Sequence, residues 1–129
     1  MALVINDRVK ENSTTSGTGN ITLAGVAAGQ GNVTFNSGIG TSNTTYYCIF
    51  EQGTNTFEIG LGTLSGSTTL ERTTVINNSS GNTSKINCTG GTLDVYCTMP
   101  AAKTVYLDST GTPVGAASAG FALAMAVAL

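Results

Sequence analysis

Short runs of β-branched and aromatic residues recur along this chain at a spacing of roughly ten residues, with Gly, Asn and Ser between them. The densest run is residues 44–50, where nearly every residue has high β-propensity. Thr, Ser, Asn and Gly make up 61 of the 129 residues, a composition that suits Thr-rich strands joined by turns. The pattern predicts an all-β chain, a single-domain antiparallel sandwich or barrel of about nine short strands.

We expect one β domain over residues 1–129. Residues 1–19 should form a short N-terminal strand (3–9) and an extended arm, because 10–19 show no hydrophobic period. The β core is expected over 20–110, with strands at 20–28 and 33–35 among others. A loop and an apolar C-terminal strand should follow over 111–129.

Alternating residues assign the faces of several strands. In residues 56–61, Phe57, Ile59 and Leu61 share one face, and Glu58 lies on the other. Two later strands show the same alternation, and their inward residues should be Leu93, Val95 and Cys97 in one and Val105 and Leu107 in the other. The dipeptide Gly90-Gly91 predicts a tight hairpin between 85–88 and 92–99.

Residues 121–129 carry a large apolar residue at every odd position and Ala at every even one. This period of two puts five large side chains on one face of a strand, whereas a helix would spread them around its surface. Ala favours helices, but the alternation leads us to predict a strand. An exposed apolar strand promotes aggregation, so we expect it to be buried in its own core or against a neighbouring subunit.

Charge and chemistry exclude several classes of function. Seven acidic and five basic residues give a net charge of −2, too little to neutralise a phosphate track, so no nucleic-acid partner is expected. The absence of His removes the commonest general base and metal ligand, and we expect neither an enzyme nor a cofactor. Glu51, Glu58 and the Glu71-Arg72 pair are expected to be solvated. The alternatives are a paired-carboxylate acid/base site for Glu51 and Glu58 and pairing across a subunit contact for Glu71-Arg72.

The tyrosines are expected to pack in a core or an interface rather than to stack on bases, and a carbohydrate site on the loops stays open. Three cysteines with no CxxC pattern indicate reduced, buried thiols, with a Cys88–Cys97 bridge as the minor alternative. Residues 1–5 do not resemble a signal peptide, so folding in a cytoplasm is expected. The apolar stretch 116–129 is shorter than the roughly 20 residues of a spanning helix, and no membrane partner is expected.

Several segments together resemble a known family. ALVINDRVKE at residues 2–11, TTSGTG at 14–19 and ITLAG at 21–25 are similar to the opening of small virion proteins of tailed bacteriophages, which also begins longer fibre-like proteins. TYY at 45–47, FEIGLGT at 57–63, LERTTV at 70–75, and DVY, PA and KTVYLD between 94 and 108 follow in the family's order. The resemblance covers residues 2 to about 110. Phe57 replaces the family's usual Trp, and residues 121–129 have no counterpart in the general pattern.

The resemblance implies a virion structural protein, made in the cytoplasm of a bacterial host. We expect a capsid cement or decoration protein on the capsid surface, with the major capsid protein as its partner. A tail, head-tail connector or fibre-anchoring component in few copies is the alternative. A homo-oligomer is expected, and a trimer suits a capsid site. The candidate subunit contacts lie in the N-terminal arm and the C-terminal strand: Leu3, Ile5, Arg8, Lys10, Phe121, Leu123, Met125, Val127 and Leu129.

Overall fold

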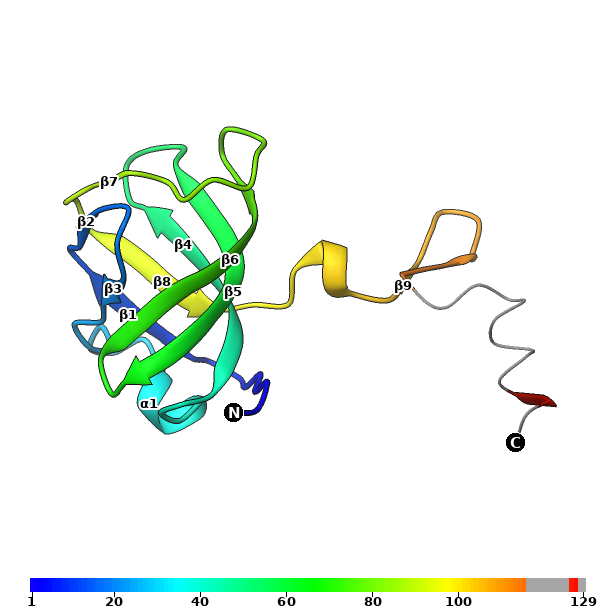
Figure 1. The fold of residues 1–129 in the computed structure, drawn as a ribbon, viewed down its shortest axis with the longest axis horizontal. Coiled ribbons are helices and arrows are strands. Elements are labelled where there is room, and N and C mark those ends of the chain that lie inside the picture. Colours follow the sequence, from blue (N-terminus) through cyan, green and yellow to red (C-terminus); the bar gives the residue numbers. More distant parts are fainter. Residues whose placement is uncertain (116–125, 128–129) are drawn as a thin grey trace.

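The computed structural model of the protein describes residues 1–115 and 126–127. Its main element is a six-stranded antiparallel sheet that curls into a nearly closed barrel, as Figure 1 shows, and this confirms the predicted all-β class. Around the barrel the strand order is β1-β8-β4-β5-β6-β3. The bounds are β1 Lys10–Ser13, β3 Ile21–Thr22, β4 Thr44–Glu51, β5 Phe57–Gly66, β6 Thr69–Asn78 and β8 Leu93–Cys97.

Four shorter strands form two small sheets outside the barrel. One sheet pairs β2 (Ser16–Gly17) with β7 (Cys88–Thr89), and the other pairs β9 (Tyr106–Leu107) with β10 (Pro113–Val114). The named helical elements are α1 (Phe35–Gly38) and the 3-10 turn η1 (Ala101–Lys103), and Ala126 and Val127 are helical as well. No helix in the described part of the chain is long and apolar enough to cross a membrane.

Backbone hydrogen bonds close the barrel between its first strand and the chain after β3. The Asn12 N–H donates to the Gly25 carbonyl at 2.9 Å, and the Ala24 N–H donates to the Asn12 carbonyl at 2.8 Å. The Lys10 N–H donates to the Val33 carbonyl at 3.1 Å. Because β8 pairs with the other edge of β1, these bonds satisfy backbone groups that an edge strand would leave open.

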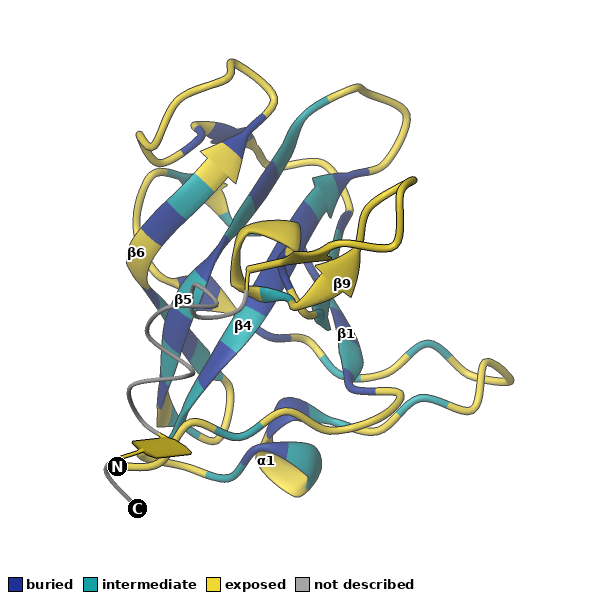
Figure 2. Cartoon of the chain, turned by 90° about the vertical axis from the view of Figure 1, so that its right-hand side faces the viewer, coloured by how far each residue is buried: buried dark blue, intermediate teal, exposed yellow. Residues whose placement is uncertain are grey.

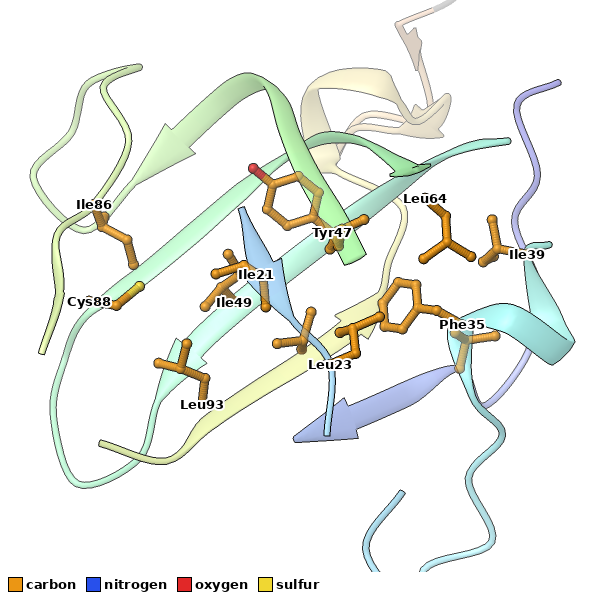
Figure 3. Close-up of a cluster of buried hydrophobic side chains, with 13 residues drawn as sticks. Ile21, Leu23, Phe35, Ile39, Tyr47, Ile49, Leu64, Ile86, Cys88 and Leu93 are labelled. Carbon is orange, nitrogen blue, oxygen red and sulfur yellow. The ribbon is translucent and has the colours of Figure 1, made fainter. Parts of the chain in front are cut away.

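The hydrophobic core fills the barrel interior (Figure 3). It is built from Val9, Ile21, Leu23, Phe35, Ile39, Tyr47, Ile49, Leu64, Leu70, Ile86, Cys88, Leu93 and Val95. The central position predicted for residues 44–50 is correct, because β4 pairs with both β5 and β8. The inward orientation predicted for Leu93 and Val95 is also confirmed, and Cys97 packs against the cluster from its edge.

Several local predictions near the N-terminus are wrong. The polar stretch 10–19 forms β1 and β2 instead of a loop or arm, because its backbone pairs with β8 and β7. Residues 3–9 contain only isolated bridges, from Leu3 to Thr44 and from Val9 to Val33. The strand predicted for 20–28 shrinks to β3.

Two further predictions fail because local and tertiary interactions override the pattern. The strand predicted for 33–35 gives way to α1, where the Thr34 hydroxyl caps the helix by accepting the Ser37 N–H at 3.1 Å. The hairpin predicted at Gly90-Gly91 does not form, because β7 pairs with β2 while β8 pairs with β1 and β4.

Candidate subunit interface

Three apolar residues of β5 face outward. The two faces predicted for this strand are observed, but Glu58, Gly60 and Gly62 point inward and Phe57, Ile59 and Leu61 point outward. Two of these glycines make room for Tyr47, because a Cβ on Gly60 would lie 2.6 Å from the Tyr47 hydroxyl, and one on Gly62 would lie 2.9 Å from its ring. The side chains of Phe57, Ile59 and Leu61 therefore lie on the outside of the barrel, whereas Leu64, further along β5, belongs to the core.

The outward residues of β4 and β8 extend this surface. Across the β4–β5 pair, Phe50 lies opposite Phe57, Cys48 opposite Ile59 and Tyr46 opposite Leu61. Across the β4–β8 pair, Cys48 lies opposite Tyr96. We call this set the outer apolar face: Tyr46, Cys48, Phe50, Phe57, Ile59, Leu61 and Tyr96. Its members shield one another, so all are half-buried except Cys48, which is buried without belonging to the core cluster.

Residues 99–115, the hairpin extension, leave the barrel at the end of β8 and project from it (Figure 1). The extension contains η1 and the β9–β10 pair. The inward orientation predicted for Val105 and Leu107 is wrong: the two residues are 61% and 66% exposed. Met99, Tyr106 and Val114 are exposed as well. These apolar side chains have no core to enter, because β9 pairs only with β10.

Leu3 and Ile5 lie near the base of the extension. Leu3 is 52% and Ile5 47% exposed, and the intervening Val4 donates its N–H to the Thr44 carbonyl at 2.9 Å. The Thr98 N–H donates to the Tyr46 carbonyl at 3.2 Å, so the N-terminal segment and the start of the extension both contact the first residues of β4. Figure 2 views the molecule from this side, with β9 in front of β4.

A shallow cavity of about 360 Å³ borders the outer apolar face on its β1 side. Val9, Asn32 and Cys97 line it together with the predicted contact residues Arg8 and Lys10, and Tyr96 belongs to both the cavity and the outer apolar face. This border of the outer apolar face therefore carries two cations.

The two cations differ in their partners. Lys10 forms an ion pair with Asp94 at 3.3 Å. Arg8 has a positive φ of 59° and donates to the backbone carbonyls of Gln30 and Gly31. Within the described residues, Arg8 has no carboxylate partner.

The C-terminal candidates are only partly covered by the structure. Ala126 and Val127 are helical, so the strand predicted for residues 121–129 is not observed at these two positions, and Val127 is 78% exposed. Phe121, Leu123, Met125 and Leu129 lie outside the described residues.

Glu51, Glu58 and Arg72, expected to be solvated, are buried, which corrects that prediction, whereas Glu71 is half-buried. Glu58 and Arg72 form a fully buried ion pair, in which Arg72 Nε donates to Glu58 Oε1 at 2.8 Å and Nη2 donates to Oε2. The Tyr47 hydroxyl donates to Glu58 Oε1 at 2.6 Å, and the Ile86 N–H donates to Oε2 at 2.8 Å. Arg72 is thus paired inside its own chain, with Glu58 and not with its neighbour Glu71.

Hydrogen bonding sets the protonation of this network. Burial acts to raise the pKa of Glu58, but the bonds from Arg72, Tyr47 and Ile86 outweigh it and lower the pKa below its ordinary value. Burial, together with the bond to Glu58, raises the pKa of Tyr47. The network is therefore an ionised carboxylate held by a guanidinium and a neutral phenol. It lines neither of the two cavities described here, and its three side chains are buried in the barrel.

Two more buried carboxylates are held by backbone groups. Glu51 accepts the Thr89 hydroxyl and the Thr89 N–H, and these bonds lower its pKa. Glu11 accepts the Phe35 N–H at 2.7 Å and lines a second cavity of about 410 Å³, which is also bordered by Thr34 and Asn36. Glu51 and Glu58 do not face each other as a catalytic pair, because each is committed to different partners.

The described residues contain neither a cluster of metal ligands nor a disulfide bond. No group of three or more Cys, Asp or Glu residues in the described part of the chain is placed to hold a metal ion. Cys48, Cys88 and Cys97 are all free thiols, as predicted from their spacing. No family model, no curated protein and no solved structure matches this chain.

Proposed function

We propose that the protein is a bacteriophage virion structural protein, a capsid cement or decoration protein that binds the assembled head and stabilises it. The sequence resemblance over residues 2 to about 110 suggests the virion. The observation that supports a binding role most directly is the apolar surface on one side of the barrel. There the outer apolar face and the hairpin extension leave large side chains uncovered, and such surfaces mark sites of association.

The energetics suit a protein that acts by association. Complete burial of a Val or Leu side chain contributes about 1.5–3 kcal/mol, and the exposed fractions of Val105 and Leu107 leave about two thirds of that to be gained in a contact. Each residue therefore has about 1–2 kcal/mol to contribute. A protein that binds the assembled shell, and not isolated capsid subunits, stabilises the shell by mass action.

The copy number per purified virion tests this proposal, by quantitative mass spectrometry against the major capsid protein. A ratio of one copy to one or a few capsid subunits is expected for a cement protein. A dozen copies or fewer would contradict cementing and favour the alternative role in the tail, connector or fibre anchor. Absence from the particle would overturn the virion assignment.

The C-terminal segment, residues 121–129, provides a second test of the same proposal. Removal of residues 121–129 is expected to lower capsid occupancy while the barrel keeps its circular dichroism spectrum, because these residues follow the barrel and the hairpin extension in sequence. The matched control exchanges the large residues of this segment for other large apolar residues, which preserves the alternation. Normal occupancy of the truncated protein would remove the segment from the interface.

A further inference from the structure

We propose that the hairpin extension of one copy docks on the outer apolar face of a second copy of the same chain. This docking mode rests on the proposed function in one respect, because it treats this side of the barrel as an interface. It adds that the partner at this interface is a second copy of the chain. The hairpin extension exposes large apolar side chains, and the outer apolar face carries a row of half-buried ones, so the two surfaces could cover each other.

The direction of the extension argues for a second copy. From Thr98 the chain runs away from its own barrel (Figure 1), and Val105, Tyr106 and Leu107 remain exposed in the isolated chain. The outer apolar face lies on the side from which the extension departs, since its members Tyr46 and Tyr96 lie next to the departure point. The outer apolar face of a neighbouring barrel is not joined to this extension, so the extension can approach that face from outside.

The two surfaces match in chemistry. The outer apolar face is bordered on the β1 side by the cavity with Arg8, the cation that lacks a carboxylate partner in the described chain. The extension carries one acidic residue, Asp108, which directly follows Leu107. Docking of Leu107 on aromatic and aliphatic side chains would bring the Asp108 carboxylate toward the border where Arg8 lies. In the docked pair, the outer apolar face with Arg8 at its border would therefore contact the apolar hairpin that carries Asp108.

The Asp108 carboxylate is already oriented for such a contact. Its Oδ1 accepts the N–H groups of Thr110 and Thr112 at 2.8 and 2.9 Å and the Thr110 hydroxyl at 2.7 Å. These bonds hold the carboxylate in one orientation on an exposed loop, where Asp108 is accessible to a partner.

The donor and acceptor surfaces are different parts of the chain, so each copy both gives an extension and receives one. Contacts between different surfaces close into a ring where the rotation between copies closes and otherwise continue as an open filament, whereas a reciprocal exchange gives a two-fold pair. A closed ring and a two-fold pair both cover the exposed apolar residues of every copy. Residues 121–129 then remain available for the capsid contact proposed above.

The test uses complementary variants of the full-length chain, whose mass is measured by sedimentation equilibrium. Leu107→Asp disables the extension, and Ile59→Asp disables the outer apolar face. The matched controls Ser109→Asp and Thr73→Asp place the same charge on the extension and on neighbouring β6, outside the apolar set. The unmodified chain and both controls are expected to be oligomeric, and each of the two interface variants is expected to be monomeric.

Mixing the two monomeric variants is the decisive measurement. One variant keeps its outer apolar face and the other keeps its extension, so an equimolar mixture should form a heterodimer with one intact contact. Ile59→Thr, which retains the β-branch, replaces Ile59→Asp should the latter not give the circular dichroism spectrum of the unmodified barrel. No association on mixing would overturn the proposal.

A monomeric unmodified chain at every soluble concentration would also overturn it. That outcome is separate from the proposed function, because a monomer found in many copies on virions would retain the cement role and lose only the self-association. An oligomer that Leu107→Asp leaves intact would place the self-contact elsewhere and equally reject the docking mode.

Discussion

Replacement of Arg72 by Met tests whether the buried ion pair holds the barrel together. Arg72 spans from β6 to Glu58 on β5 and also donates to the Ile86 carbonyl at 2.8 Å. Met fills much of the same volume but offers no donor. Glu58 would then keep only the Tyr47 hydroxyl and the Ile86 N–H as hydrogen-bond donors.

The expected cost follows from the charge left behind. Removing one partner of a buried ion pair costs about 3–5 kcal/mol, because the remaining charge is desolvated and uncompensated. Typical domains unfold with a free energy of only about 5–15 kcal/mol. The Arg72→Met variant should therefore lose a large share of its stability near neutral pH.

The pH dependence gives the sign of the effect. In the unmodified chain the pKa of Glu58 is lowered, so its ionised form contributes stability above the unfolded pKa of about 4.3, and this is lost as the pH falls through the folded pKa. Without Arg72, burial is no longer balanced by a cation, and the pKa of Glu58 should rise above the unfolded value. The variant's deficit should then be largest near neutral pH and shrink as the pH falls, first through the raised pKa of Glu58 in the variant and then through the lowered pKa in the unmodified chain.

Urea denaturation followed by circular dichroism, near neutral pH and near pH 4, measures both quantities. Lys85→Met is the matched control, because Lys85 is an exposed cation and its loss should cost no more than about 0.5 kcal/mol. The double variant Glu58→Gln with Arg72→Met should regain part of the loss by removing the charge. A cost for Arg72→Met equal to that of Lys85→Met, or a deficit independent of pH, would refute this reasoning.

Three further predictions concern packing and reactivity. Gly60→Ala should destabilise the barrel by about 1–3 kcal/mol in urea denaturation, because its Cβ would lie 2.6 Å from the Thr74 carbonyl oxygen. Gly19→Ala is the control, because the space around its Cβ is open. Equal effects of the two substitutions would contradict the packing argument. Phe35→Ala should cost about 3–5 kcal/mol, since Phe35 is fully buried in the core, and a loss below about 1 kcal/mol in the same assay would show that the site is not packed. In the folded chain, Cys97 should react with a thiol reagent before Cys48 and Cys88, whose burial also raises the pKa of their thiols; equal rates for all three would contradict the burial described here.

The strands that the sequence predicts well are those whose partners are close along the chain. β4, β5 and β6 follow one another through short turns, and each carries β-branched or aromatic residues that mark it as a strand. The position of β1 was not predictable in this way, because its residues KENS are polar and its partner β8 lies near the end of the barrel. A strand held by distant backbone pairing leaves no period in its own residues.

The orientation of β5 shows a second limit. A polar residue between apolar ones normally points to solvent, so Glu58 was expected outside. Its inward position depends on Arg72, which lies on the next strand, and on the space that Gly60 leaves for Tyr47. The alternating glycines were visible in the sequence and were the available clue to the close approach of a large side chain. The outer apolar face follows from the same inversion, and it was missed for the same reason.

The pairing of β1 with β8 has a consequence for synthesis in the cell. Lys10 pairs with Tyr96, 86 positions later in the chain. At about 5–20 residues per second, the ribosome needs roughly 4–17 s to produce the partner after β1 has been made. During this interval the β4–β5–β6 meander can form from neighbouring segments, while the edge of β1 that pairs with β8 has no partner. The charged and polar residues of β1 keep the unpaired strand soluble. The same residues that hide β1 from pattern analysis therefore also protect the nascent chain from aggregation.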